Sequence, residues 1–129
     1  MARQEYLNRL GGEILDAAVT VHKAFGPGLL ESAYEHALLR ELQLRELDVK
    51  RQIPVNLHYK GAVLEKGFVV DLMVEDEIIL EIKAVDVMHS VYYAQLITYL
   101  KLTDKKLGYL INFNVMLLKD GFKRVVYNF

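Results

Sequence analysis

The sequence predicts an α/β domain in which helices and a β-sheet pack in layers. Two stretches with helical spacing of apolar residues come first, over residues 4–25 and 30–47. From residue 49 the pattern changes to alternating apolar and polar residues, which is typical of strands, and a third helical pattern follows over residues 90–102. With 129 residues, 53% of them hydrophobic, the chain can bury one core but not two, so we expect residues 1–129 to form a single domain.

The two N-terminal helices are predicted from apolar stripes. Gly11 and Gly12 mark a weak point in the first helix, and Gly26-Pro27-Gly28 ends it. The stripe residues are Leu7, Leu10, Ile14, Ala17, Ala18, Val21 and Phe25 in the first helix, and Ala33, Tyr34, Ala37, Leu38 and Leu42 in the second. We therefore expect two helices before the first strand.

Turn residues separate the predicted strands. Residues 49–59 alternate in character, and Lys60-Gly61 marks a turn after them. Two apolar stretches, residues 67–74 and 77–85, then flank the acidic turn Glu75-Asp76-Glu77. This pattern predicts four or five strands before the third helix and two after it, with Asp120-Gly121 leading into the last strand.

The composition excludes several classes of protein. The chain has a net charge of −1 and 26% charged residues, so it lacks the strong positive charge of proteins that bind nucleic acid tightly and nonspecifically. It has no cysteine, which excludes disulfides and thiolate metal sites and fits the reducing cytoplasm. The first residues do not resemble a secretion signal, and no apolar run approaches the ~18 residues of a membrane span. We therefore expect a cytoplasmic protein with no membrane partner.

Two ionisable residues, Glu81 and Lys83, interrupt an otherwise apolar strand. A three-residue turn at 75–77 pairs Val74 with Ile78 and places Asp71 opposite Glu81, whereas a two-residue turn puts the two carboxylates on opposite faces. The apolar pattern favours the first register. It then places Asp71, Glu81 and Lys83 on one face and gathers the apolar residues on the other, namely Val70, Leu72, Val74, Ile78, Leu80 and Ile82.

In this register the two carboxylates are suited to holding a cation. Directly opposed residues have Cβ atoms roughly 4.5–5.5 Å apart, so Asp71 and Glu81 repel each other unless a proton, a metal ion or Lys83 compensates their charge. Mg²⁺ prefers oxygen ligands and keeps several waters, and Mn²⁺ fits the same ligands. Lys83 could then hold a phosphate or orient the attacking water. The alternative is an ion pair of Lys83 with Glu81 or Asp71 that only fixes the register.

Three motifs carry a resemblance to a known family. Asp71, a nine-residue gap and Glu81-Ile82-Lys83 resemble the D…ExK core of the PD-(D/E)XK nuclease superfamily. The residues from Gly28 to Tyr34 match the motif that names the GxxExxY family within it, and Gln95 and Tyr99 resemble its QxxxY element. The resemblance implies a restriction-endonuclease-like fold, with a mixed sheet flanked by helices.

The resemblance also implies roles for individual residues. Asp71, Glu81, Glu31 and the backbone carbonyl of Ile82 would bind Mg²⁺ or Mn²⁺, and Lys83 would assist the reaction. Glu31 is expected on the packed side of its helix, although an acidic residue in a first turn is also favoured by the helix dipole. Gln95 and Tyr99 would border the site, whereas Gly28 and Tyr34 are expected to be structural.

The function implied is hydrolysis of phosphodiester bonds in nucleic acid, with DNA expected more than RNA. The alternative is a non-catalytic module that keeps the fold and binds nucleic acid or protein. Tyr92, Tyr93 and the C-terminal residues 125–129 could support a homodimer. Four basic residues precede the site, and they either contact phosphates or form a solvated face: Lys50, Arg51, Lys60 and Lys66. Gln52 loosely resembles a polar position near the site of the family.

Overall fold

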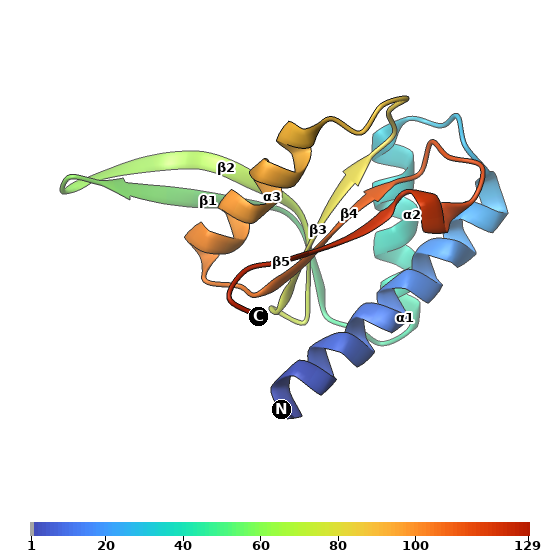
Figure 1. Ribbon diagram of the computed structural model, residues 1–129, viewed down its shortest axis with the longest axis horizontal. Coiled ribbons are helices and arrows are strands. Elements are labelled where there is room, and N and C mark those ends of the chain that lie inside the picture. The colour runs from blue at the N-terminus through green and yellow to red at the C-terminus, as the bar shows by residue number, and fades with distance from the viewer. Residues whose placement is uncertain (1) are drawn as a thin grey trace.

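The structure, a computed structural model that describes residues 2–129, is a five-stranded sheet with helices on both of its faces (Figure 1). This arrangement confirms the predicted α/β fold class. The elements in order are α1 (Ala2–Phe25), α2 (Glu31–Leu44), β1 (Val49–Tyr59), β2 (Ala62–Val74), β3 (Ile78–Lys83), α3 (Ser90–Thr103), β4 (Leu107–Asn112), the 3-10 turn η1 (Leu118–Asp120) and β5 (Phe122–Val126).

The sheet is mixed, as the resemblance implies. Its strand order is β1-β2-β3-β4-β5, with β3 parallel to β4 and the other neighbours antiparallel. The prediction of four or five strands before α3 is wrong, because β2 is one strand of 13 residues. Gly67, which marked a break in the sequence pattern, lies inside β2 at an irregularity between β1 and β2, where a Cβ would come within 2.2 Å of Leu57.

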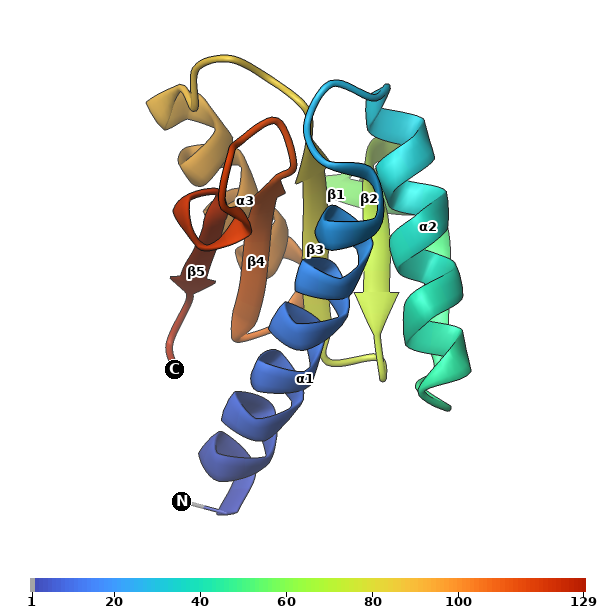
Figure 2. The same cartoon turned by 90° about the vertical axis from the view of Figure 1, so that its right-hand side faces the viewer.

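The helices divide between the two faces of the sheet, as Figure 2 shows. Helices α1 and α2 cover one face, and their apolar stripes pack on Leu72, Leu80 and Ile82. Helix α3 covers the other face, where Leu96 and Leu100 pack on Ile79. Polar residues of the central strands are therefore held in a rigid sheet between two apolar layers.

Helix α1 runs unbroken through Gly11 and Gly12, so these glycines do not divide it. Gly11 is buried where the helix crosses Tyr109 of β4, and a Cβ at this position would lie 1.9 Å from the tyrosine hydroxyl oxygen. Gly12 is exposed, and a Cβ there would meet nothing within 4 Å. The helix ends at Gly26, whose φ of 68° leaves the right-handed helical region.

Replacing Gly11 with alanine is expected to lower the free energy of unfolding by about 1–3 kcal/mol, because the new methyl group overlaps a buried ring. Gly12→Ala is the matched control. It should raise the free energy of unfolding by about 0.5–1 kcal/mol, because alanine favours the helix and meets no neighbour. Urea unfolding of both variants measures the difference, and similar shifts in the same direction would contradict the close approach of α1 to Tyr109.

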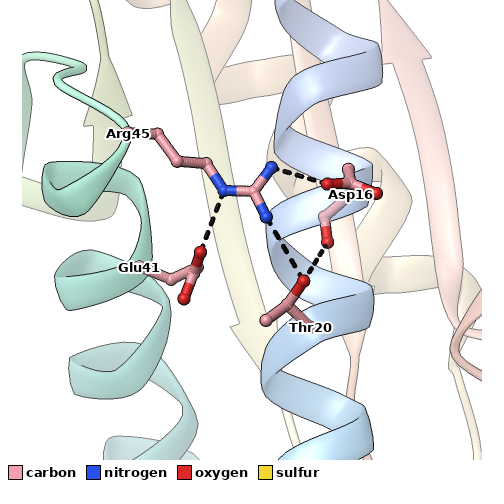
Figure 3. Close-up of polar contacts among 4 residues, drawn as sticks. All are labelled: Asp16, Thr20, Glu41 and Arg45. Atoms are coloured by element: carbon pink, nitrogen blue, oxygen red, sulfur yellow. Dashed lines mark hydrogen bonds and ion pairs between the residues drawn. The ribbon is translucent and has the colours of Figure 1, made fainter.

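Arg45, the residue after α2, ties this helix to α1 (Figure 3). Its guanidinium group donates to the carboxylate of Asp16, 2.7 Å away, and to the hydroxyl of Thr20, 3.2 Å away, both on α1. The same group also pairs with Glu41 of its own helix at 2.9 Å. These contacts fix how α2 lies beside α1, and α2 carries acidic residues close to the central strands.

Beyond the sheet, the outer parts of β1 and β2 project as a ribbon (Figure 1), which we call the arm, residues 53–69. Lys60 and Gly61 form its two-residue turn, and both have the positive φ, 46° and 82°, that such a turn requires. Strand β1 is an edge strand, which permits Pro54 within it. None of the helices within residues 2–129 combines the length and apolar character needed to cross a membrane.

Candidate active site

The candidate site lies where β2 and β3 separate. The two strands pair only from Leu72–Leu80 to Val74–Ile78, which confirms the predicted three-residue turn. Beyond Leu72, β2 continues into the arm with β1, while β3 continues beside β4 to Lys83. We call this point the fork. Asp71 and Glu81 are the first residues beyond the last paired residues of the two strands.

At the fork, two hydrogen bonds from backbone N–H groups to side-chain carboxylates replace the backbone hydrogen bonds that would join β2 and β3. The backbone N–H of Ile82 donates to Oδ2 of Asp71 at 2.9 Å, and the backbone N–H of Asp71 donates to Oε2 of Glu81, also at 2.9 Å. Each carboxylate therefore uses one oxygen to hold the opposite strand. The second oxygen of each remains available for another ligand, although Oδ1 of Asp71 also accepts from Gln52 at 3.2 Å.

The predicted apolar face of the hairpin is wrong at one residue, Val70. Five of the six expected residues pack in the core beneath α1 and α2, but Val70 packs in the other core with Leu96 and Leu100 of α3. The prediction assumed strict alternation through Asp71. Beside Asp71, β1 has Gln52, whose φ of 53° is not a strand conformation. The regular alternation of side chains between the two faces of the sheet is lost at this point.

Glu81 has a strongly perturbed environment. Its side chain is 5% exposed, and burial first, then the negative charge of Asp71, raises its pKa from 4.5 to about 8. The backbone N–H of Asp71 and the charge of Lys83 act in the opposite direction without cancelling the shift. The fork is thus a place where negative charge is concentrated and incompletely compensated.

In the presence of a chelator, the free energy of unfolding is expected to fall as pH rises from about 4.5 to about 8. The folded protein holds the Glu81 proton more tightly than the unfolded chain does, since the pKa rises from 4.5 to about 8 on folding. The resulting stabilisation is complete below the unfolded pKa and lost above the folded one. Urea titrations at several pH values should show this slope in the wild type and a flatter one in Glu81→Gln; parallel curves would contradict it.

Lys83 lies beside the two carboxylates without pairing with either. Its Nζ atom is 4.5 Å from the centre of the Tyr92 ring of α3, a cation–π contact, and the side chain is half-buried. Among the described residues it makes no ion pair within 4.0 Å, so the alternative of a register-fixing pair with Glu81 or Asp71 is not what the structure contains. The amino group therefore remains free to meet an anionic ligand.

Comparison with known families agrees with this geometry. The model of the PD-(D/E)XK nuclease superfamily matches residues 8–125, which includes the whole fork. The chain belongs to this superfamily. No curated protein and no solved structure matches it. The three residues that resemble the D…ExK core in the sequence, Asp71, Glu81 and Lys83, lie at the fork of the sheet.

Glu31, the fourth acidic or basic residue expected in the PD-(D/E)XK site, lies in the first turn of α2. It shares a helix face with buried Glu35 but is itself exposed, so the expectation that it is removed from free solvent is met only in part. Its position at the helix end explains this, because no neighbouring turn covers it. Partial desolvation of the carboxyl group raises its pKa, Lys83 lowers it and Asp71 raises it, so Glu31 lies within electrostatic reach of the fork.

Glu35, which the sequence analysis missed, is the acidic residue of α2 that is buried. It is 4% exposed and accepts hydrogen bonds from Gln52 and, at 2.7 Å, from Nε of Arg51. Burial first, and then the charge of Asp71, raises its pKa. Helical spacing offered a signal, because Glu35 is one turn after Glu31 and shares its face.

Gln52 connects Glu35 to the fork. Its Nε2 atom donates to both carboxylate oxygens of Glu35, at 3.0 and 3.1 Å, and to Oδ1 of Asp71 at 3.2 Å. The positive φ of Gln52 is costly for a residue other than glycine, and such strain is concentrated at functional sites. The strained backbone aims the amide at the two carboxylates, so Gln52 and Glu35 together hold the orientation of Asp71.

The remaining predicted residues lie at different distances from the fork. Tyr99 stacks on Phe68 with ring centres 4.2 Å apart, and burial, then the charges of Glu81 and Asp71, raise its pKa. Gln95 is exposed one turn earlier on α3. Tyr34 is buried, and its hydroxyl donates to the carbonyl of Gly26, while Gly28 adopts a φ of 105° that favours glycine.

A cavity of about 500 Å³ lies away from the fork, between the end of α1 and the segment that precedes β5. It is lined mainly by apolar side chains, and none of the predicted site residues contributes to it. The residues are Val19, His22, Lys23, Gly26, Pro27, Met116, Leu117, Leu118 and Lys119. The cavity is therefore separate from the candidate site at the fork.

Proposed function

We propose that this protein is a divalent-metal-dependent nuclease that hydrolyses phosphodiester bonds at the fork. The observation that carries the proposal is the pairing of two incompletely compensated carboxylates, Asp71 and Glu81, with an amino group that has no acidic partner, Lys83. A cation would relieve the repulsion that raises the pKa of Glu81, and a phosphate would give Lys83 an anionic partner.

The residues at the fork fit Mg²⁺ or Mn²⁺. Glu81 offers one free oxygen, and Oδ1 of Asp71, which accepts one hydrogen bond from Gln52, has room for a further ligand. Ile82 presents its carbonyl to the same side as its N–H, which points at Asp71. Among residues 2–129, no three acidic or histidine side chains converge into a complete metal cage. Two carboxylates with water and substrate phosphate are the ligands that Mg²⁺ typically has in such enzymes. Glu31 would act on this ion through its charge or a bound water.

The roles of the other residues follow from their contacts. When bound, the ion would polarise the phosphodiester and lower the pKa of a bound water. Lys83, whose position is restricted by the Tyr92 ring, donates to the phosphate oxygens, where negative charge grows in the transition state. Gln52 and Glu35 keep Asp71 in one orientation, and Tyr99 closes the α3 side of the fork.

A panel of nucleic acids tests the proposal. Purified protein is incubated with single-stranded, double-stranded and branched DNA and with RNA, each with Mg²⁺, Mn²⁺ or a chelator. We expect cleavage of at least one substrate, DNA before RNA, with metal and none with chelator. Glu81→Gln, prepared in the same way, is the control for contaminating nucleases. No cleavage together with no calorimetric binding of Mn²⁺ would overturn the proposal in favour of a non-catalytic module.

A further inference from the structure

The arm and the start of β1 at its base together carry a net positive charge. Residues 49–69 have four basic residues, Lys50 and Arg51 at the base and Lys60 and Lys66 in the arm, and one acidic residue, Glu65, which gives a net charge of +3. The whole chain has a net charge of −1, so the remaining residues together carry −4. A polyanion is therefore attracted to residues 49–69 and repelled by the rest of the chain as a whole.

The lysines of the arm and its base are available to a partner. Lys50, Lys60 and Lys66 are exposed, and none of them pairs with an acidic residue among residues 2–129. Arg51 differs, because it pairs with Glu35 beside the fork. Unpaired lysines therefore lie both at the base of the arm, near the fork, and in the arm itself.

The dimensions of the arm match a duplex. The nine residues from Val70 to Ala62 are joined by eight steps of roughly 3.3 Å, so they extend about 26 Å. That length equals about eight phosphates of one strand at 3.4 Å each. A two-stranded ribbon is narrow enough for the major groove of B-DNA, about 12 Å wide, and is excluded from the deep, narrow major groove of duplex RNA.

The edge of the arm is unsuited to pairing with a second copy of this chain. Pro54 of β1 offers no N–H to a neighbouring strand, and Lys66 on the outer part of β2, which β3 does not cover, opposes further pairing there. Apolar side chains near the tip are nevertheless exposed, with Tyr59 at 61%, Val63 at 55% and Leu64 at 47%. In a groove, such side chains can contact base edges and thymine methyl groups.

We propose that the arm lies in the major groove of a DNA duplex, where Lys60 and Lys66 contact phosphates up to about eight nucleotides from the bond held at the fork. The inference deepens the proposed function and rests on it for the position of the scissile bond. Binding by the arm is measurable without cleavage, so the two proposals can fail separately.

The test measures binding with chelator present, so that no cleavage occurs. Fluorescence anisotropy with a labelled DNA duplex of about 24 base pairs, three times the reach of the arm, compares the wild type with K60Q/K66Q. The matched control is K23Q/K119Q, which removes the same charge from exposed lysines at the distant cavity. We expect K60Q/K66Q to bind at least about tenfold more weakly at low salt, with a salt slope smaller by about 1.8. The control should stay within about twofold of the wild type.

Three results would overturn the inference. Equal losses in K60Q/K66Q and K23Q/K119Q would mean that only net charge matters, and equal losses on duplex DNA and duplex RNA would exclude a groove-specific contact. A dimer in sedimentation analysis that Val63→Asp dissociates, with DNA binding unchanged in K60Q/K66Q, would assign the arm to a second copy. Arm-dependent binding without cleavage in Mg²⁺ would instead defeat only the nuclease proposal.

Discussion

Asp71→Asn is expected to reduce metal-dependent cleavage by more than about 10²-fold and to weaken Mn²⁺ binding in calorimetry. Loss of an outer partner of a metal ligand already costs 10–100-fold, so loss of a ligand charge should exceed that range. Asparagine keeps an oxygen that can accept the hydrogen bond from the Ile82 N–H. In the wild type, this N–H lies 2.9 Å from Oδ2 of Asp71. The strands should therefore stay together, and the loss of cleavage and of Mn²⁺ binding should come from the missing charge and not from a disrupted fold.

The control for Asp71→Asn is the same exchange at an exposed acidic residue in the turn between β2 and β3, Asp76→Asn. It should leave cleavage and Mn²⁺ binding unchanged. Urea unfolding should show Asp71→Asn within about 1 kcal/mol of the wild type, since the hydrogen bond to Ile82 survives. Full activity of Asp71→Asn would place the active site elsewhere in the chain.

Lys83→Met is expected to reduce the rate of cleavage by about 10²–10³-fold, the usual cost of removing one group that stabilises charge in the transition state. Metal binding should persist or strengthen, because the change removes a positive charge beside two carboxylates. The apolar methionine can still pack against the Tyr92 ring, which lies 4.5 Å from Nζ in the wild type. Steady-state kinetics and Mn²⁺ titration of one preparation measure both effects.

Two further variants sharpen the test of Lys83. Lys83→Arg keeps the positive charge and should recover part of the rate, whereas Lys101→Met, at an exposed lysine of α3, should have no effect. If Lys83→Met lost Mn²⁺ binding in step with activity, the lysine would be needed to assemble the site and would have no separate role in the reaction.

The hairpin that carries the site could be predicted from the sequence because strand side chains alternate strictly. A shift of one residue would bury Asp71 and expose Leu72, so the apolar pattern alone determined the pairing of Val74 with Ile78, which the structure confirms. The side of the sheet taken by Val70 could not be predicted in this way. It depends on the positive φ of Gln52 in the neighbouring strand, which no local pattern of β2 records.

Glu35 shows a second limit of sequence reasoning. Helical spacing places it on the same face as Glu31, but its burial depends on Arg51 and Gln52, which reach it from β1. A buried carboxylate is tolerated only with such partners, and partners from another element are not visible in the helix itself. The resemblance drew attention to Glu31, the exposed member of the pair.

The two hydrogen bonds that join β2 and β3 at the fork affect which metal ion the protein would select. Asp71 and Glu81 each give one oxygen to a backbone amide, so binding an ion with both oxygens would compete with the hydrogen bonds that join the two strands. Calcium takes six to eight oxygen ligands, often including both oxygens of one carboxylate, whereas the smaller magnesium is satisfied with six in a tight octahedron. The way the two strands are joined would thus discriminate against calcium, by denying it the number of contacts it needs.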